Sequence, residues 1–326
     1  MGYMPNSEDP CEKIEKEIEK LKAEKKALQK DLQNASTGEK PSIIKQINAI
    51  NKLISKKEKE LKNCNPLQDS NSLTKRVGKI LLEGTDGEVG LYLKKVSGQI
   101  LAKFHEHKVF EPASTIKVIL HFHAIRQIQA NPMLFLAQVP WYTDYVLDNA
   151  GIPTSCPADT GPLVSGLLYL LGEMMQKSDN RATQAIRSYF GEQNINNTAH
   201  WIGMYSTSYN HRDGCAGGPD GAIADPNALT LENAGLLYEG VANGSLLTFD
   251  MRYTFYLLMA GKYYDSTSVW KDINKIVDDE SPAGMSDAKK QSFLAEADTR
   301  YKAGGYSVAG LEYRTIAGWA KNSVPD

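Results

Sequence analysis

The stretch EPASTIKVIL, residues 111–120, decides how the rest of the chain is interpreted. Its proline and the apolar run that follows predict a helix over Thr115–Gln129, with Ser114 at the helix N-terminus. Free backbone N–H groups and the helix dipole favour a developing oxyanion there. Lys117 lies one turn further along the same face, where apolar neighbours would lower its pKa and let it accept the serine proton. The stretch therefore predicts an activated serine nucleophile.

Two later motifs give this Ser-x-x-Lys tetrad a context that it lacks alone. Ser178-Asp179-Asn180 follows Leu163–Gln176, an apolar segment with the pattern of a buried helix. Lys302-Ala303-Gly304 is the only Lys-x-Gly of the chain and lies on a strand predicted over Arg300–Tyr306. Taken singly, the first motif is also a helix cap and the second a strand end beside a turn. The tetrad itself recurs at Ser42/Lys45, Ser72/Lys75, Ser268/Lys271 and Ser286/Lys289.

In this order the three motifs resemble the signature set of class A β-lactamases and penicillin-binding proteins. The resemblance runs from about Leu73 to the end of the chain, with 64 residues from Ser114 to Ser178 and 124 from Ser178 to Lys302. It implies an α/β (α+β) fold, in which helices flank an antiparallel sheet of the β-lactamase and transpeptidase type. It also implies a serine hydrolase that uses no cofactor.

The resemblance assigns a catalytic or binding role to each motif. Ser114 would be acylated, Lys117 would act as its base or proton relay, and Ser178 would pass a proton to the leaving nitrogen. Asn180 would hold the amide side chain of the substrate and the lysine. Lys302 would supply positive charge for the substrate carboxylate.

The same resemblance predicts the remaining parts of the substrate pocket. The oxyanion hole would consist of the backbone N–H groups of Ser114 and Gly305, the second of which follows the motif glycine Gly304. Asp179 would cap and brace its turn.

Two positions depart from the family pattern. Asp213 stands where a deacylating glutamate is expected, and its side chain is one methylene shorter, so a bridging water would be displaced. The alternative is that Asp213 is a solvated acid of the loop. If deacylation is slow, the protein would retain β-lactams instead of destroying them. Ala303 replaces a hydroxyl residue and removes a hydrogen bond to the substrate carboxylate worth about 1.5–3 kcal/mol. Arg314, on a strand predicted over Glu312–Ala320, would compensate.

Residues 8–64 predict an antiparallel coiled-coil hairpin. Isoleucines and leucines recur at spacings of three, four and seven in two segments, separated by the breakers Gly38 and Pro41. Residues 65–72 form the predicted linker and residues 73–326 the serine hydrolase domain. Only 24 residues follow Lys302, which favours a C-terminally incomplete domain.

The four cysteines predict two disulfides and an oxidising compartment. The midpoint between Cys11 and Cys64 falls between residues 37 and 38, inside the predicted turn, so a bond between them would close the open end of the hairpin. Cys156 and Cys215 would then tie the segment before the apolar helix to the loop of Asp213. Free thiols are the alternative for both pairs.

Bulk properties exclude several other classes of protein. A formal net charge of -2 gives no reason to expect a nucleic-acid partner. No apolar run is long enough to span a membrane, and no signal peptide is visible, so an extracytoplasmic protein would have had its export signal removed. No metal is expected, because histidines two positions apart do not converge on a helix. The histidines concerned are His105, His107, His121 and His123.

Three functions are compatible with these residues. The first is a hydrolase that opens β-lactam rings through an acyl-serine, acting on a small molecule or a peptidoglycan-like substrate. The second is a D,D-peptidase or esterase on the same scaffold. The third is a non-catalytic cell-wall or β-lactam-binding module on a helical stalk. The hairpin would serve self-association or docking to a partner.

The rest of the pattern predicts a mixed α/β domain. Predicted helices cover Leu73–Leu82, Asp179–Tyr189, Leu229–Val241 and Met251–Leu258, predicted strands cover Glu88–Lys95 and Gln99–His107, and a long loop covers Asn210–Pro226.

Overall fold

The computed structural model describes residues 10–35, 38, 40–62, 71–158, 162–215, 225–262, 286–308 and 311–321. The chain divides into two compact units. The first comprises residues up to Lys94 together with Ile100–Glu106. The second comprises Lys95–Gln99 and the chain from His107 onward, and it carries all three motifs.

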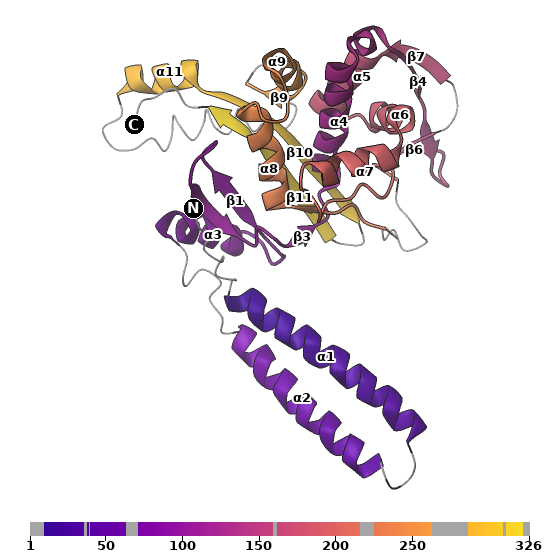
Figure 1. Cartoon of the computed structure of the whole chain (residues 1–326), viewed down its shortest axis with the longest axis vertical. Helices are drawn as coiled ribbons and strands as arrows, with labels where there is room; N and C mark the ends of the chain where they lie inside the picture. The colour runs from indigo at the N-terminus through magenta and orange to yellow at the C-terminus, as the bar shows by residue number, and fades with distance from the viewer. Residues whose placement is uncertain are drawn as a thin grey trace. The chain divides into compact units, whose positions relative to one another are not determined.

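The first unit begins with the predicted antiparallel helical hairpin. Helices α1 (Pro10–Asn34) and α2 (Lys40–Lys62) pack against each other side by side (Figure 1). Ile18, Ile50 and Ile54 are buried. Because single helices of this composition are marginal in water, this apolar contact stabilises both. The predicted bond between Cys11 and Cys64 lies outside the described residues.

The rest of the first unit is a helix packed on a two-stranded antiparallel sheet. Helix α3 (Ser72–Glu83) contacts β2 (Ile100–Phe104), which pairs with β1 (Leu91–Lys94). The Asn71 side chain caps the helix by accepting a hydrogen bond of 2.8 Å from the backbone N–H of Thr74. Ser72, the last residue of the predicted linker, is the first residue of this helix.

The second unit is built around α4 (Lys117–Ala130), of which ten of fourteen residues are buried. A helix that is apolar all round must be covered on every side, which explains why its sequence shows no polar face. Helices of the second unit pack against it, as Figure 1 shows. These helices are α5 (Leu167–Gln176), α6 (Asn180–Phe190), α7 (Glu192–Trp201) and α9 (Phe249–Leu257).

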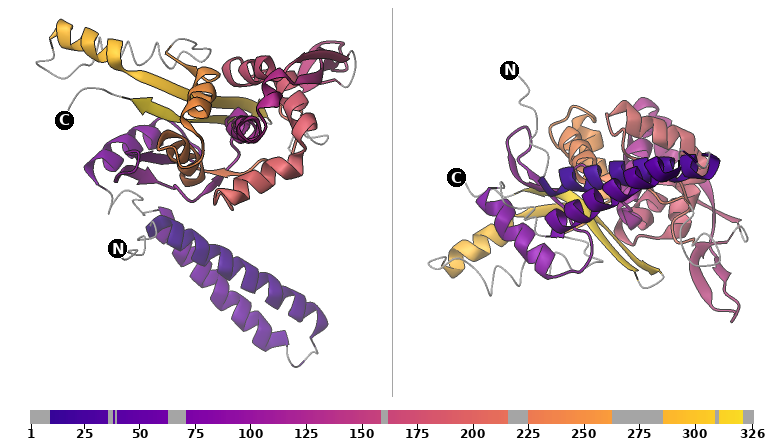
Figure 2. Two further views of the ribbon diagram at one scale, coloured as in Figure 1. Left: turned by 45° about the horizontal axis from the view of Figure 1, so that its top comes forward. Right: turned by 90° about the horizontal axis from the view of Figure 1, so that it is seen from below.

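A three-stranded antiparallel sheet in the order β11-β10-β9 lies in the same unit. The long strands β10 (Asp298–Val308) and β11 (Leu311–Lys321) include both predicted closing strands and extend beyond them. Their register places Lys302 opposite Ala317 and Gly305 opposite Arg314. Helix α8 (Leu231–Ala242) contacts β11, and Figure 2 shows the yellow strands running past it. Strand β9 (Ala260–Gly261) and helix α11 (Asp287–Glu296) precede β10 in the chain.

Three short antiparallel pairs complete the unit, and two of them correct predicted helices. The predicted helix over Leu163–Gln176 begins only at Leu167, because residues 162–166 pair with another strand. Likewise Leu229 and Thr230 pair as a strand before α8 begins. The pairs are β3 (Val109–Phe110) with β8 (Leu229–Thr230), β4 (Gln138–Tyr142) with β7 (Pro162–Gly166), and β5 (Tyr145–Leu147) with β6 (Pro153–Pro157).

Among the described helices, none combines the length and the apolar character needed to cross a membrane.

Truncation of the core should cost much more stability than truncation of a surface residue of the same type. Leu171 on α5 is fully buried, whereas Leu147 on β5 is 59% exposed. We expect Leu171→Ala to lower the free energy of unfolding by about 2–5 kcal/mol, since it removes packed methyl groups and leaves a cavity. Leu147→Ala should change it by no more than about 0.5 kcal/mol. Urea unfolding measures both, and equal effects would contradict the packing described here.

Candidate active site

Ser114 lies on a 3-10 turn, η1 (Ala113–Ile116), which leads directly into α4. The predicted helix therefore starts at Lys117 and not at Thr115. The turn is strained at Ala113, whose φ is 47°. The side chain of Glu111 supports it by accepting a hydrogen bond of 3.1 Å from the backbone N–H of Ala113. Ser114 thus sits at the tip of the buried helix.

Strand β10 lies directly against this turn at Gly304. A Cβ at Gly304 would lie 2.6 Å from the backbone nitrogen of Ser114 and 2.7 Å from that of Thr115. Such distances leave no room for a side chain. Glycine at this position is therefore what allows the strand to approach the nucleophile.

Two threonines bind both long strands to the same turn. The hydroxyls of Thr115 and Thr315 are 2.7 Å apart, and Thr315 donates to the carbonyl of Pro112 at 2.5 Å. Thr115 also lies 3.3 Å from the carbonyl oxygen of Lys302. Sequence reasoning missed this pair, because nothing in the motif spacing connects residue 115 with residue 315.

Lys117 is fully buried, and its ammonium nitrogen contacts the second motif. Nζ donates to Oδ1 of Asn180 at 2.6 Å and to the carbonyl of Ser178 at 2.9 Å, and it lies 3.4 Å from the Ser178 hydroxyl. Burial lowers the pKa of Lys117, while the charges of Asp213 and Asp179 oppose the shift. A lysine in this environment is suited to accept a proton.

Lys302 approaches the same serine from β10. Its Nζ donates to the Ser178 hydroxyl at 2.9 Å and to the carbonyl of Ala303 at 2.7 Å. Burial, reinforced by the charge of Lys117, lowers the pKa of Lys302 to about 7, and Asp213 opposes the shift. Lys302 therefore changes its charge near neutral pH.

Ser178 lies between the two lysines because of an uncommon backbone conformation. Its φ is 60°, in the left-handed region that few residues other than glycine adopt. The next residue, Asp179, caps α6 by accepting from the backbone N–H groups of Arg181 at 2.7 Å and Ala182 at 3.1 Å. Burial alone would raise the pKa of Asp179, but the hydrogen bonds from Arg181 and Ala182 and the charge of Arg181 together outweigh burial and lower it. Asp179 is thus an ionised brace of the turn.

A pocket of about 560 Å³ opens at these motifs. Arg314 and Gly305 face each other across the strands, since a Cβ on Gly305 would lie 2.7 Å from Nη1 of Arg314. Arg314 is paired with the Glu312 carboxylate. The pocket is lined by Ser114, Ser178, Ala303, Gly304, Gly305, Arg314, Thr315 and Ile316.

Asp213 is buried, so it is not a solvated loop acid. Its Oδ2 accepts a hydrogen bond of 2.8 Å from the hydroxyl of Tyr209, which is also buried. Burial, together with the Asp213 charge, raises the pKa of Tyr209 well above its ordinary value, so Tyr209 remains a donor. Sequence reasoning missed Tyr209, whose only signal was its position four residues before the predicted base.

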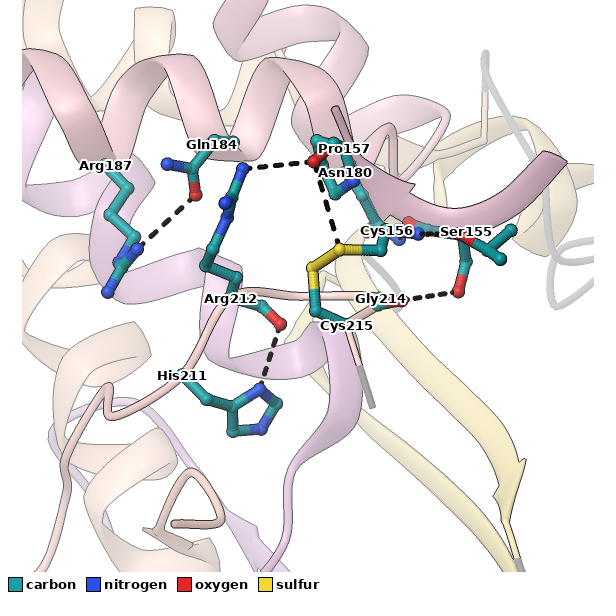
Figure 3. Close-up of a disulfide and its surroundings, with 11 residues drawn as sticks. Ser155, Cys156, Pro157, Asn180, Gln184, Arg187, His211, Arg212, Gly214 and Cys215 are labelled. Carbon is teal, nitrogen blue, oxygen red and sulfur yellow. Dashed lines mark hydrogen bonds between the residues drawn. A yellow bond between two sulfur atoms is a disulfide. The ribbon is translucent and has the colours of Figure 1, made fainter. Parts of the chain in front are cut away.

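Cys156 and Cys215 form a disulfide, the pair expected once Cys11 is matched with Cys64. Figure 3 shows it between the Asn180 end of α6 and the loop that carries Arg212. Beside it, Nδ2 of Asn180 donates to the carbonyl of Ser155 at 3.0 Å. Ser155 is a further contact that the sequence did not reveal.

Within the described ranges, no three histidine, cysteine or carboxylate side chains lie close enough together to hold a metal ion. The histidines of α4 serve the core instead. His121 contacts the carbonyl of Phe255 at 2.9 Å, and His123 contacts the hydroxyl of Thr198 at 2.7 Å. Burial lowers the pKa of each histidine to about 4.

The architecture is that of β-lactamases and penicillin-binding proteins. The chain resembles a β-lactamase from Sphaerobacter thermophilus at 15% identity and a TM-score of 0.54, covering 77% of this chain and 89% of that one. A β-lactamase from Chitinophaga pinensis is similar at 14% identity and 0.57, covering 76% and 85%. PBP-A, solved as a mutant in an acyl-enzyme complex with penicillin G, matches at 16% identity and 0.52, covering 76% and 82%.

Sequence comparison assigns the family. Residues 72–278 match the beta-lactamase enzyme family, and the chain belongs to it. Comparison with curated protein sequences finds no match.

Burial of Lys302 should cost stability in a pH-dependent way. Its folded-state pKa of about 7 lies below the ordinary lysine pKa of 10.5, so the unfolded chain binds more protons between these values and stability rises with pH there. Lys302→Met removes this penalty. We therefore expect its gain in unfolding free energy over the wild type to be largest below about pH 7 and to shrink towards pH 10.5.

Urea unfolding between pH 6 and pH 10 measures this difference. The matched control is Lys321→Met, since Lys321 is an exposed lysine on β11. A difference for Lys302→Met that stays constant over this range would contradict the depressed pKa.

Proposed function

We propose that the protein is a serine hydrolase that opens β-lactams or related amides through an acyl-serine intermediate. One observation carries this proposal. The side chains of Lys117, Ser178, Asn180 and Lys302, which come from three separate motifs, form one hydrogen-bonded network beside the pocket of Ser114. Convergence of a nucleophile, a desolvated amine and a second hydroxyl is what acyl transfer requires.

In the proposed acylation, the hydroxyl oxygen of Ser114 attacks the carbonyl carbon and its proton passes to neutral Lys117. The backbone N–H groups of Ser114 and Gly305 stabilise the oxyanion. Ser178 then donates its proton to the leaving nitrogen as the C–N bond breaks, and Lys117 returns the proton to Ser178. The contact of 3.4 Å between Lys117 Nζ and the Ser178 hydroxyl supports this route.

The cationic groups of the pocket favour an anionic substrate. Lys302, in its protonated form, and Arg314 would face the carboxylate of a β-lactam or of a peptide C-terminus. Asn180 would bind the amide side chain of the substrate. Ala303 supplies no hydroxyl, and Thr315, although it lines the pocket, already donates to Pro112.

In the proposed deacylation, Asp213 takes a proton from the water that attacks the acyl-serine carbonyl. The charge of Asp213 acts on both Lys117 and Lys302, which supports its placement near the reacting groups. The hydrogen bond from Tyr209 holds one carboxylate oxygen and leaves the other for a water.

We also propose an extracytoplasmic location, because the disulfide between Cys156 and Cys215 requires an oxidising compartment to persist. The helical hairpin would carry the hydrolase domain as a stalk or docking arm.

The first test is covalent labelling. Reaction with penicillin, quenched with acid before deacylation can remove the adduct, should increase the intact mass by the mass of the antibiotic, and Ser114→Ala should abolish the increase because it removes the attacking oxygen. Ser42→Ala is the matched control, since Ser42 belongs to another Ser-x-x-Lys tetrad, on α2, and should label like the wild type. A wild-type chain that never gains mass would support the non-catalytic module instead.

The second test separates hydrolysis from binding. Asp213→Asn should slow turnover of a chromogenic cephalosporin by about 10²–10⁴-fold, because an amide cannot act as the base. The acylation rate of Ser114 should change far less. Asp250→Asn is the control, since Asp250 is exposed at the start of α9. If Asp213→Asn and the wild type turn over equally fast, Asp213 is not the deacylating base.

A further inference from the structure

Three consecutive residues of β6 hold the loop that carries Asp213. The hydroxyl of Ser155 donates to the carbonyl of Gly214 at 2.8 Å, and Cys156 is bonded to Cys215. The carbonyl of Pro157 accepts from Nη2 of Arg212 at 3.1 Å. Figure 3 shows these contacts together around the disulfide. We call this set of contacts between residues 155–157 and residues 212–215 the loop clamp.

Gly214 brings the loop clamp into direct contact with the active site. Its φ is 79°, and a Cβ there would lie 2.1 Å from the carbonyl oxygen of Ser155 and 2.2 Å from Nδ2 of Asn180. The loop backbone therefore lies directly on the hydrogen bond between these two residues. Only glycine combines that φ with so close an approach.

Asp213 depends on the loop clamp more than the other site residues do. Lys117 is held within the buried helix α4, and Asn180 is the first residue of α6, a helix capped by Asp179. Asp213 lies on a loop, in which Tyr209 supports its carboxylate from the N-terminal side and Gly214 follows it immediately. Besides the disulfide, one hydrogen bond on each side of Asp213 links the loop to β6, from Arg212 to the carbonyl of Pro157 and from Ser155 to the carbonyl of Gly214.

We propose that the disulfide between Cys156 and Cys215 is a positioning element for Asp213, so that its loss impairs hydrolysis of the acyl-serine while acylation continues. This inference rests on the proposed function. Reduction of the bond would convert a protein that turns β-lactams over into one that retains them covalently.

The reduction is chemically simple. A dithiol supplies two electrons and two protons, the S–S bond breaks to give two thiols, and the dithiol closes to a cyclic disulfide. No group of the active site is oxidised or reduced in this step.

The test compares acylation and deacylation rates in the full chain. In the double variant Cys156→Ser/Cys215→Ser, acylation by penicillin should stay within about threefold of the wild type. Deacylation should slow by about 10–100-fold, since a displacement of about 1 Å of a catalytic group has effects of that order. Intact mass against time gives both rates, and the acyl adduct should accumulate. Equal deacylation rates in the variant and the wild type would overturn the proposal.

Dithiothreitol provides a matched experiment without mutation. The reduced wild type should accumulate the adduct as the double variant does, and the variant should show no further change with the reductant. This control is needed because Cys11 and Cys64 meet the same reagent. If the variant responds to dithiothreitol as strongly as the wild type, the effect comes from other cysteines, and the role of this bond is refuted.

Hydrogen exchange tests the positioning without any catalysis. Reduction should speed amide exchange in the loop segment 207–215 and leave α6 protected. Unchanged exchange in the loop would refute the positioning role, even if the unfolding of a variant obscured the kinetics. By contrast, a wild type that forms no adduct yet shows faster loop exchange on reduction would refute the proposed function and leave the loop clamp standing.

Discussion

The hydrogen bonds of the buried Lys117 amine constrain the arrangement of the site. An amine without access to water needs acceptors, or its burial becomes very costly. The two short contacts, with the Ser178 carbonyl and Asn180 Oδ1, come from the turn between α5 and α6. That turn must therefore lie against the start of α4. The same burial lowers the pKa of the amine, so one interaction both organises the fold and prepares a base.

The third motif, Lys302-Ala303-Gly304, lies beside the site mainly because its backbone packs closely against the turn of Ser114. The charge of Lys302 matters less for this placement. Gly304 lets β10 lie against the nitrogen of Ser114, and the hydroxyls of Thr115 and Thr315 fasten both long strands to the turn. Lys302 then contacts the Ser178 hydroxyl that Lys117 also approaches. Burial lowers the pKa of Lys302, the charge of Lys117 lowers it further, and the carboxylate of Asp213 counteracts this effect.

The local sequence pattern predicted those features of the fold and the site that depend on residues close together in the chain. The apolar runs indicated the buried helices, and the motif order indicated the family. The even cysteine count indicated disulfides, and matching Cys11 with Cys64 left Cys156 with Cys215 as the second pair. Residues 163–166 were misassigned as helix because their backbone pairs with a strand that the local sequence does not reveal. Tyr209 and Ser155 escaped prediction because their contacts depend on loop geometry, and in Ser155 the backbone carbonyl, which every residue has, makes the contact with Asn180.

The left-handed backbone at Ser178 has an evolutionary consequence. A residue with a Cβ is disfavoured there by about 1–2 kcal/mol. If selection acted on stability alone, replacement of this serine by glycine would be favoured. The side chain that glycine lacks is the hydroxyl between the two lysines. If related sequences retain serine at this position, they are under selection for the catalytic chemistry. If a lineage has glycine there instead, only its scaffold is still in use.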